Sequence, residues 1–250
     1  MQTQTLGTIM PVLEITLDSG ESIVSEAGEL SWMTSAIELT TSTQMGGGGG
    51  MFGAFKRMVG GSTLFMTEYK AQGGQGMVAF ATKVPGEFLP VDVTPGNFYM
   101  IHRHGFTCAT QGVELSVGFQ QSLGAGIFGG EGFRLQKLGG QCKAWIELSG
   151  EVVTYDLKPG ETLRVHPGHV GMFEHTVSFE ITRIKGIKNM IFGADGIFLA
   201  ALTGPGKVWL QSLPLPNLAH AIQPYIQVTG GEQAVGAGAV AGGILRGLSK

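Results

Sequence analysis

The amino-acid sequence predicts an all-β protein, and three observations carry that prediction. Apolar and polar residues alternate along short runs, such as residues 113–119, VELSVGF, and residues 177–182, VSFEIT. A period of two is typical of a strand with one buried face and one face in water. Turn dipeptides rich in proline and glycine separate the runs, and helix signals are few. Many short strands joined by tight turns indicate a sandwich of antiparallel sheets.

The expected strands follow one another along the chain. Each is a run of β-branched, aromatic or alternating apolar residues, and they span residues 12–17, 37–43, 63–69, 77–82, 98–102, 113–119, 133–138, 143–148, 152–156, 177–182, 197–202 and 207–213. Proline presets the first turn dihedral and glycine takes positive φ without a Cβ clash, so we expect turns at residues 85–86, 95–96, 139–140, 159–160, 167–168 and 205–206. The only helices we expect are short ones at residues 51–59 and 218–222.

The composition excludes several classes of protein. The chain has 250 residues, of which 43% are hydrophobic, so it can build a core and is not a disordered chain. Its 16 basic and 19 acidic residues give a net charge of −3, which offers no basic surface to hold nucleic acid. The first residues, MQTQTLGTIM, lack the basic end and apolar run of a signal peptide. Two cysteines, Cys108 and Cys142, form no disulfide framework, and a reducing cytoplasm is therefore expected.

The chain repeats itself at an offset of 64 residues. This offset places Gly96 on Gly160 and Trp145 on Trp209, and a looser first copy aligns Gly28 with Gly96. Because one such unit could bury its apolar faces against its neighbours, we predict three internal β repeats with pseudo-threefold symmetry, at about residues 21–88, 89–152 and 153–215. They would form a single β domain over residues 1–225, followed by a glycine-rich C-terminal tail over residues 226–250.

Aromatic residues recur in register with these copies. Seventeen residues separate Phe52 from Tyr69, and the same spacing separates Phe128 from Trp145 and Phe192 from Trp209. Large aromatic side chains at matching places are expected to form layers of one core, since each buries a large apolar area.

Three segments of the repeat carry a family resemblance. They read GAGIFGGEG at residues 124–132, KGIKNMIFG at residues 185–193 and TGPGKVWLQ at residues 203–211. Together they resemble the altered-inheritance-of-mitochondria-24 family over about residues 8–225, and the last segment is the most specific. The resemblance implies a threefold-repeated β structure similar to the trp RNA-binding attenuation protein fold, within the double-stranded β-helix class. It also implies an organising role at the mitochondrial inner membrane for eukaryotic relatives, and it brings no catalytic residues.

Histidines are the most specific candidates for a metal site. Gly96 is followed after five residues by His102 and then His104, a spacing that opens the first metal motif of cupins. Residues i and i+2 of a strand share a face, so both imidazoles could reach one ion. An approximate echo follows 64 residues later at His166, His169 and Glu174. A purely structural alternative is that a polar residue suits the strand end after each Pro-Gly turn.

Other motifs point to little chemistry. Residues 124–129 match the dinucleotide pattern Gly-x-Gly-x-x-Gly, but a strand-like run follows them where a phosphate-binding helix is needed. Both cysteines lie in apolar, strand-like surroundings, where a thiol is usually inert. We therefore expect no catalytic residue and no cofactor.

Two glycine-rich apolar segments suggest contact with a membrane surface or partner. Residues 45–59 combine apolar side chains with Lys56 and Arg57, and residues 234–248 space glycines as packed helices do. Both are too short to span a bilayer, and a surface loop and a frayed tail are the plainer interpretations.

The sequence thus favours a non-enzymatic β scaffold that forms a homo-oligomer and binds a partner protein or a membrane surface. We expect it in the cytoplasm, peripheral to the inner face of the membrane. The alternative is a cupin-like metal-dependent enzyme that uses His102, His104, His166 and His169. RNA binding is suggested only by analogy with the attenuation-protein fold, and the negative charge argues against it.

Overall fold

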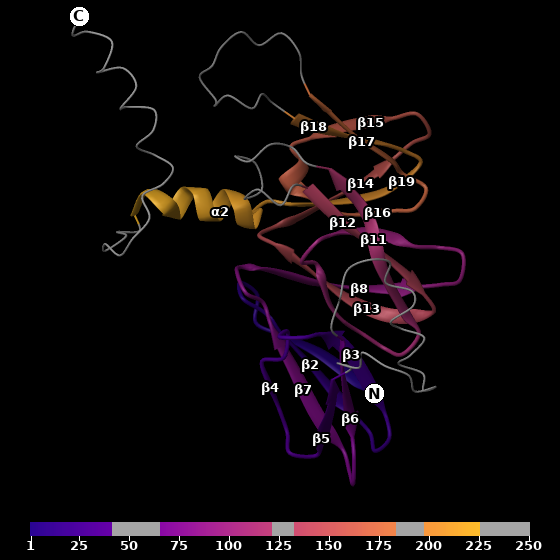
Figure 1. The fold of residues 1–250 in the computed structure, drawn as a ribbon, viewed down its shortest axis with the longest axis vertical. Helices are drawn as coiled ribbons and strands as arrows, with labels where there is room; N and C mark the ends of the chain where they lie inside the picture. The colour runs from indigo at the N-terminus through magenta and orange to yellow at the C-terminus, as the bar shows by residue number, and fades with distance from the viewer. Residues whose placement is uncertain (42–65, 122–132, 184–197, 226–250) are drawn as a thin grey trace, which may run out of the picture. The chain divides into compact units, whose positions relative to one another are not determined.

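A computed structural model describes residues 1–41, 66–121, 133–183 and 198–225, and it confirms the all-β class (Figure 1). The chain divides into two compact units, Met1–Leu218 and Ala219–Lys250. Every strand of the described residues lies in the first unit. The predicted helix at residues 51–59 lies outside the described residues, whereas the predicted helix at residues 218–222 is the end of α2 (Leu215–Ile222).

The strands form four antiparallel sheets, which we call sheets A to D. Sheet A has the order β1-β2-β7-β4, sheet B β5-β6-β3-β10-β13-β8, sheet C β11-β12-β9-β16-β19-β14 and sheet D β15-β18-β17. Their bounds are β1 (Gln2–Leu6), β2 (Val12–Leu17), β3 (Ser22–Glu26), β4 (Trp32–Met33), β5 (Ile37–Thr41), β6 (Met66–Ala71), β7 (Gly76–Ala81), β8 (Gly86–Val93), β9 (Tyr99–His102), β10 (Phe106–Ala109), β11 (Val113–Gln121), β12 (Phe133–Gly140), β13 (Cys142–Ser149), β14 (Val152–Leu157), β15 (Thr162–Val165), β16 (Val170–Glu174), β17 (Ser178–Arg183), β18 (Phe198–Thr203) and β19 (Gly206–Gln211). Two short 3-10 helices complete the described elements, η2 (Pro167–His169) and η4 (Gln223–Tyr225).

The pairing scheme of the strands recurs along the chain. We define set 1 as β2–β7, set 2 as β8–β13 and set 3 as β14–β19. In every set the last strand pairs with both the first and the third strand, and the fifth pairs with both the second and the fourth. Superposition of the three sets, and with it the pseudo-threefold symmetry, stays a prediction.

The first set begins earlier than the predicted boundary at residue 21. Strand β2 pairs with β7 as β8 pairs with β13, so Val12 rather than a residue after 21 opens the set. The turns that follow β2 and β8 are alike: the amide of Glu21 donates to the Asp18 carbonyl, and that of Asn97 donates to the Thr94 carbonyl. Gly20 has a φ of 91° in this turn, which only glycine adopts at little cost. By pairing, Gly20 and not Gly28 therefore takes the place of Gly96.

Successive sets are joined by shared sheets. Sheet B continues from set 1 into set 2 where β3 pairs with β10, and sheet C continues from set 2 into set 3 where β9 pairs with β16. Each six-stranded sheet therefore contains three strands from each of two sets.

Three hydrophobic cores fill the spaces between the four sheets. The first core joins sheets A and B and includes Leu13, Tyr69 and Trp145. The second joins sheets B and C around Ile101 and Leu138, and the third joins sheets C and D. The alternation of β2 explains its part, because Leu13, Ile15 and Leu17 are buried while the residues between them are half-exposed. Tyr69 and Trp145 lie in the first core, whereas Trp209 packs against the second, so these three aromatic residues do not form layers of one core. Their predicted partners Phe52, Phe128 and Phe192 lie outside the described residues.

Candidate functional site

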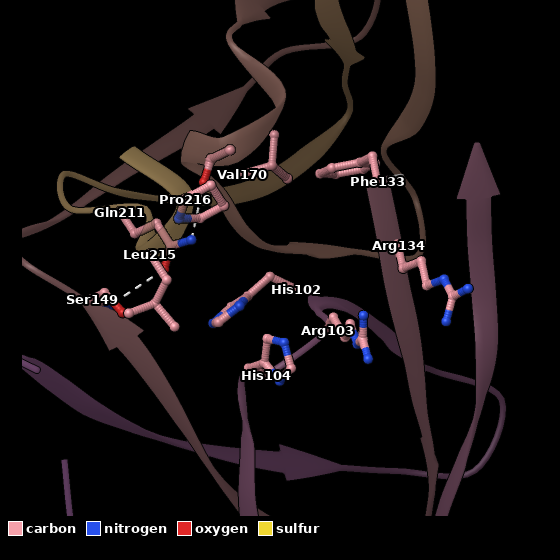
Figure 2. Close-up of a pocket in the computed structure, with 11 residues that line it drawn as sticks. His102, Arg103, His104, Phe133, Arg134, Ser149, Val170, Gln211, Leu215 and Pro216 are labelled. Atoms are coloured by element: carbon pink, nitrogen blue, oxygen red, sulfur yellow. Dashed lines mark hydrogen bonds between the residues drawn. The ribbon is translucent and has the colours of Figure 1, made fainter. Parts of the chain in front are cut away.

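A small cavity of about 150 Å³ lies where sheets B and C meet near the end of sheet C's central strands. Its wall combines polar and apolar groups from β9, the β9–β10 turn, β12, β13, η2, β16, β19 and α2 (Figure 2). The lining residues are His102, Arg103, His104, Phe133, Arg134, Ser149, Gly168, Val170, Gln211, Leu215 and Pro216. Residues far apart in the sequence therefore converge here because the sheets are shared between sets.

His102 is the last residue of β9, and its hydrogen bonds stabilise the backbone around it. Its Nε2 lies 2.9 Å from the carbonyl oxygen of Glu147, so Nε2 carries the proton and donates it. The amide of Gly105 in turn donates to the His102 carbonyl at 2.9 Å. Burial lowers the pKa of His102 to about 4, because the charged imidazolium would lose its hydration. At neutral pH His102 is a neutral donor to the backbone.

A fixed amide forms another part of the wall. The side-chain oxygen of Gln211 accepts a hydrogen bond from the Ser149 amide at 3.1 Å, and its nitrogen donates to the Gly168 carbonyl at 3.0 Å. Because both polar atoms of this buried amide are occupied, its orientation is determined by the network. This amide stabilises the junction of β13, β19 and η2, and both of its polar atoms are already used in that role.

The remaining polar wall is cationic. Arg103, His104 and Arg134 line the cavity, and in Figure 2 the guanidinium ends of both arginines point toward the same side. Burial lowers the pKa of His104, and the nearby charges of Arg103 and Lys83 lower it further. The buried Nε of Arg134 has no hydrogen-bond partner among the described residues. Since none of the described lining residues is acidic, the cavity is chemically suited to a small anion.

Carboxyl groups lie close to this cationic wall without lining it. Burial raises the pKa of Glu26, whose carboxylate accepts a hydrogen bond from Gln136 at 2.8 Å. Burial also raises the pKa of Glu147, which accepts from the Lys83 amide at 3.2 Å. Each acid accepts a hydrogen bond from a distant part of the chain, Glu26 from β12 and Glu147 from the segment after β7, so their position has a structural explanation.

The structure divides the predicted histidines between two places. His102 and His104 line the cavity, whereas the rings of His166 and His169 pack edge to face with centroids 5.9 Å apart. His169 donates from Nδ1 to the Gln211 carbonyl at 2.8 Å, and Glu174 accepts from the Lys207 amide. Among the described residues, no three histidine, cysteine or acidic side chains gather closely enough to hold a metal ion. Metal binding by these histidines therefore stays a prediction.

Sequence reasoning did not find Arg134 or Gln211 as site residues. Arg134 is an ordinary polar position in an alternating strand, and its place beside Arg103 depends on the pairing of β12 with β9. Gln211 closes the segment 203–211 that carries the family resemblance. Its place in that segment could have indicated Gln211 as a site residue, although nothing in the sequence shows which atoms its amide bonds.

The two cysteines are free thiols; Cys108 is buried and Cys142 is half-buried. Cys108 has no exposed surface, and burial raises its pKa well above the usual range. Burial raises the pKa of Cys142 to about 11. Both sulfurs are thus protonated at neutral pH, and a protonated thiol is a poor nucleophile.

Three of the predicted features lie outside the described residues. They are the dinucleotide-like pattern at residues 124–129 and the two glycine-rich apolar segments at residues 45–59 and 234–248. Within the part that is described, no helix has the length and apolar character needed to cross a bilayer.

Fold and site together define a class: an antiparallel β protein of stacked, shared sheets with one small cationic cavity at a junction of strand sets. The chain belongs to the family described as Mitochondrial biogenesis AIM24, whose model matches residues 3–213. This confirms the resemblance seen in the sequence.

Two streptococcal proteins are similar over most of the chain. An uncharacterised protein of Streptococcus pyogenes serotype M6 is 26% identical over 222 residues, which cover 86% of this chain and 87% of that protein. The X-ray crystal structure of a Streptococcus pyogenes protein superimposes with a TM-score of 0.69 at 22% identity, covering 90% of this chain and 99% of that one. The latter likeness supports the fold.

Proposed function

We propose that this protein is a non-enzymatic β scaffold that associates with further copies of itself. The observation that carries the proposal is the exposure of large apolar side chains on a strand at a sheet edge. Trp32 and Met33 on β4 are 46% and 36% exposed. Strand β4 ends sheet A. An open edge with apolar side chains is a template for pairing with another chain.

The polar groups of the candidate site support a structural role. The side chains of His102, His169 and Gln211 each bond a backbone group of a different element, and the thiols of both cysteines are protonated. A nucleophile needs an adjacent base and a general base needs a pKa near the working pH. Here the pKa of His102 at about 4 lies far from neutrality.

Analytical ultracentrifugation of the full chain tests the proposal. Sedimentation velocity at several concentrations, from below to above micromolar, should show species larger than a monomer whose share rises with concentration. A single monomeric species throughout this range would refute self-association.

A membrane surface or a partner protein is the second part of the proposal. We place the scaffold in the cytoplasm, peripheral to the inner face of the membrane, and the basic apolar segment at residues 45–59 supports this. Anionic vesicles should carry the intact chain down in a sedimentation assay, and salt should weaken the interaction. A chain without residues 46–59 should bind less. Equal failure of both chains would remove the membrane from the proposal.

A further inference from the structure

Inside the chain, one kind of strand junction joins each set to the next. Strand β3 of set 1 pairs with β10 of set 2, with Ser25 opposite Cys108 and Val24 opposite Ala109. Strand β9 of set 2 pairs with β16 of set 3 in the same way. There Ile101 lies opposite Met172 and Met100 opposite Phe173. The second strand of one set thus always receives the third strand of the following set.

The same two kinds of strand lie unpaired at the ends of the array. Strand β4 is the third strand of set 1, and among the described strands it pairs only with β7. Strand β15 is the second strand of set 3, and among the described strands it pairs only with β18. Among the described strands, β4 therefore lacks a partner that corresponds to β3, and β15 lacks a partner that corresponds to β10.

Exposure of β4 agrees with a missing partner. Trp32 corresponds to Cys108 and Met172 by its pairing with the last strand of the set. Trp32 pairs with Ala79, Cys108 pairs with Trp145, and Met172 pairs with Trp209. Cys108 and Met172 are fully buried, whereas Trp32 is exposed. By the same pairing Met33 takes the place of Ala109 and Phe173, which are also buried. At these two strand positions the apolar side chains are buried in sets 2 and 3, where the junction is made, and exposed in β4, where it is not.

We propose that β15 of one copy pairs antiparallel with β4 of a second copy, which extends sheet D by the strands of the next chain. This rests on the proposed self-association and specifies its geometry. Transferring the register of either internal junction places Val165 opposite Trp32 of the second copy and Arg164 opposite its Met33. Both internal junctions give this same register.

The chemistry of the two edges fits such a pair. Val165 is buried like its counterparts Ser25 and Ile101, so it already faces a core. Arg164 is exposed, and the apolar stem of an arginine can cover a methionine while its guanidinium stays in water. The contact joins unlike edges, so it is heterologous and builds a ring if the rotation closes and a filament otherwise.

Engineered disulfides test the register. Residues directly opposite on antiparallel strands have Cβ atoms about 4.5–5.5 Å apart, whereas diagonal neighbours are about 7–8 Å apart. A chain that carries both Met33→Cys and Arg164→Cys should, under mild oxidation, form a ladder of covalent dimers and larger species. Chains with one of these substitutions should form dimers only when the two are mixed. The unsubstituted chain reports any contribution of the buried Cys108 and half-buried Cys142.

A shifted pair is the matched control. Met33→Cys with Thr162→Cys uses the same strands and the same face but places the second sulfur two residues away, so it should cross-link at least about fivefold more slowly. Equal rates for the two pairs would overturn the register. An oligomer in the ultracentrifuge without any cross-link between positions 33 and 164 would overturn this inference and leave the proposed function standing. A monomer would overturn both.

A charge at the edge provides a second readout. Trp32→Asp should raise the dissociation constant about tenfold or more, because it buries a carboxylate between paired strands. Val153→Asp, an equally exposed valine on the β14 edge, should leave it unchanged. Circular dichroism and thermal unfolding of both variants show whether each remains folded. A loss of association in Val153→Asp alone would place the interface on β14 and refute the pairing of β4 with β15.

Discussion

Among single residues, His102 shows most clearly how this protein uses its polar groups. A half-buried histidine in a cavity with two arginines could serve as a base, yet its Nε2 proton is donated to the Glu147 carbonyl. Its pKa of about 4 follows from burial, and the charge of the neighbouring His104 lowers it as well. The residue therefore stabilises the fold at neutral pH and destabilises it when it must be protonated.

His102 should contribute to acid sensitivity. An unperturbed histidine titrates near 6.5 in the unfolded chain and His102 near 4 in the folded protein. Between these values the unfolded chain binds the extra proton, so the free energy of unfolding should fall by about 2 kcal/mol from pH 7 to pH 5 through this residue. Buried Glu26 and Glu147 have raised pKa values and act in the opposite direction. Denaturant unfolding of His102→Gln, which keeps a donor but does not titrate, isolates the effect.

The control for this experiment is His175→Gln. His175 is exposed and does not line the cavity, so His175→Gln makes the same chemical change away from the Glu147 carbonyl. The same pH dependence in all three proteins would contradict a depressed pKa of His102.

The metal-binding alternative is also tested at the level of single residues. Protein purified without chelator should contain far less than one transition-metal ion per chain, because the described histidines form pairs and not a three-ligand group. Elemental analysis measures this directly. One ion per chain that is lost in His166→Ala/His169→Ala, or in His102→Ala/His104→Ala, would instead support the cupin-like enzyme and identify its ligands.

At the scale of elements, side chains near the end of the last strand of a set bond the backbone of the previous set. Glu147 in β13 accepts from the Lys83 amide, and Gln211 at the end of β19 accepts from the Ser149 amide. The acceptor lies in one set, and the donor is an amide just after the last strand of the previous set or at its end. These bonds complement the backbone pairing between sets.

Removal of the Gln211 amide should weaken this link. Gln211→Ala leaves the Ser149 amide and the Gly168 carbonyl buried without their partners, so the free energy of unfolding should fall by about 2–4 kcal/mol. Gln141→Ala, at an exposed position, should change it by less than about 0.5 kcal/mol. Chemical denaturation with matched m-values measures both. Similar small losses for the two variants would show that the Gln211 bonds contribute little.

The predictability of the elements depends on which faces of a strand are buried. Half-buried strands such as β2 and β11 show a period of two and were expected from the sequence. Strand β10 was missed because all of its residues, FTCA, are buried, which leaves no alternation. Strand β8 was missed because it contains Pro90, which is tolerated there since β8 ends its sheet. Of the site, His102 and His104 were predicted, but Arg134 joins them only through long-range pairing.

At the scale of the whole Met1–Leu218 unit, the cores are linked because sheets B and C are each shared by two of them. Strand β13 places Trp145 in the first core and Ile146 in the second. Strand β12 likewise places Leu138 in the second core and Leu135 in the third. Loss of one core would therefore expose a face of a sheet that another core needs, and the unit should unfold as one.

Leucine truncations in each core test this cooperativity. Leu13→Ala, Leu138→Ala and Leu202→Ala each remove a buried side chain from a different core and should each cost about 2–5 kcal/mol. Scanning calorimetry should show one transition at a lower Tm in every case, with equal calorimetric and van't Hoff enthalpies. The exposed Leu39→Ala should hardly shift it. If Leu202→Ala instead produced two separate transitions, the third core would unfold on its own, and the shared sheet C would not couple its neighbours.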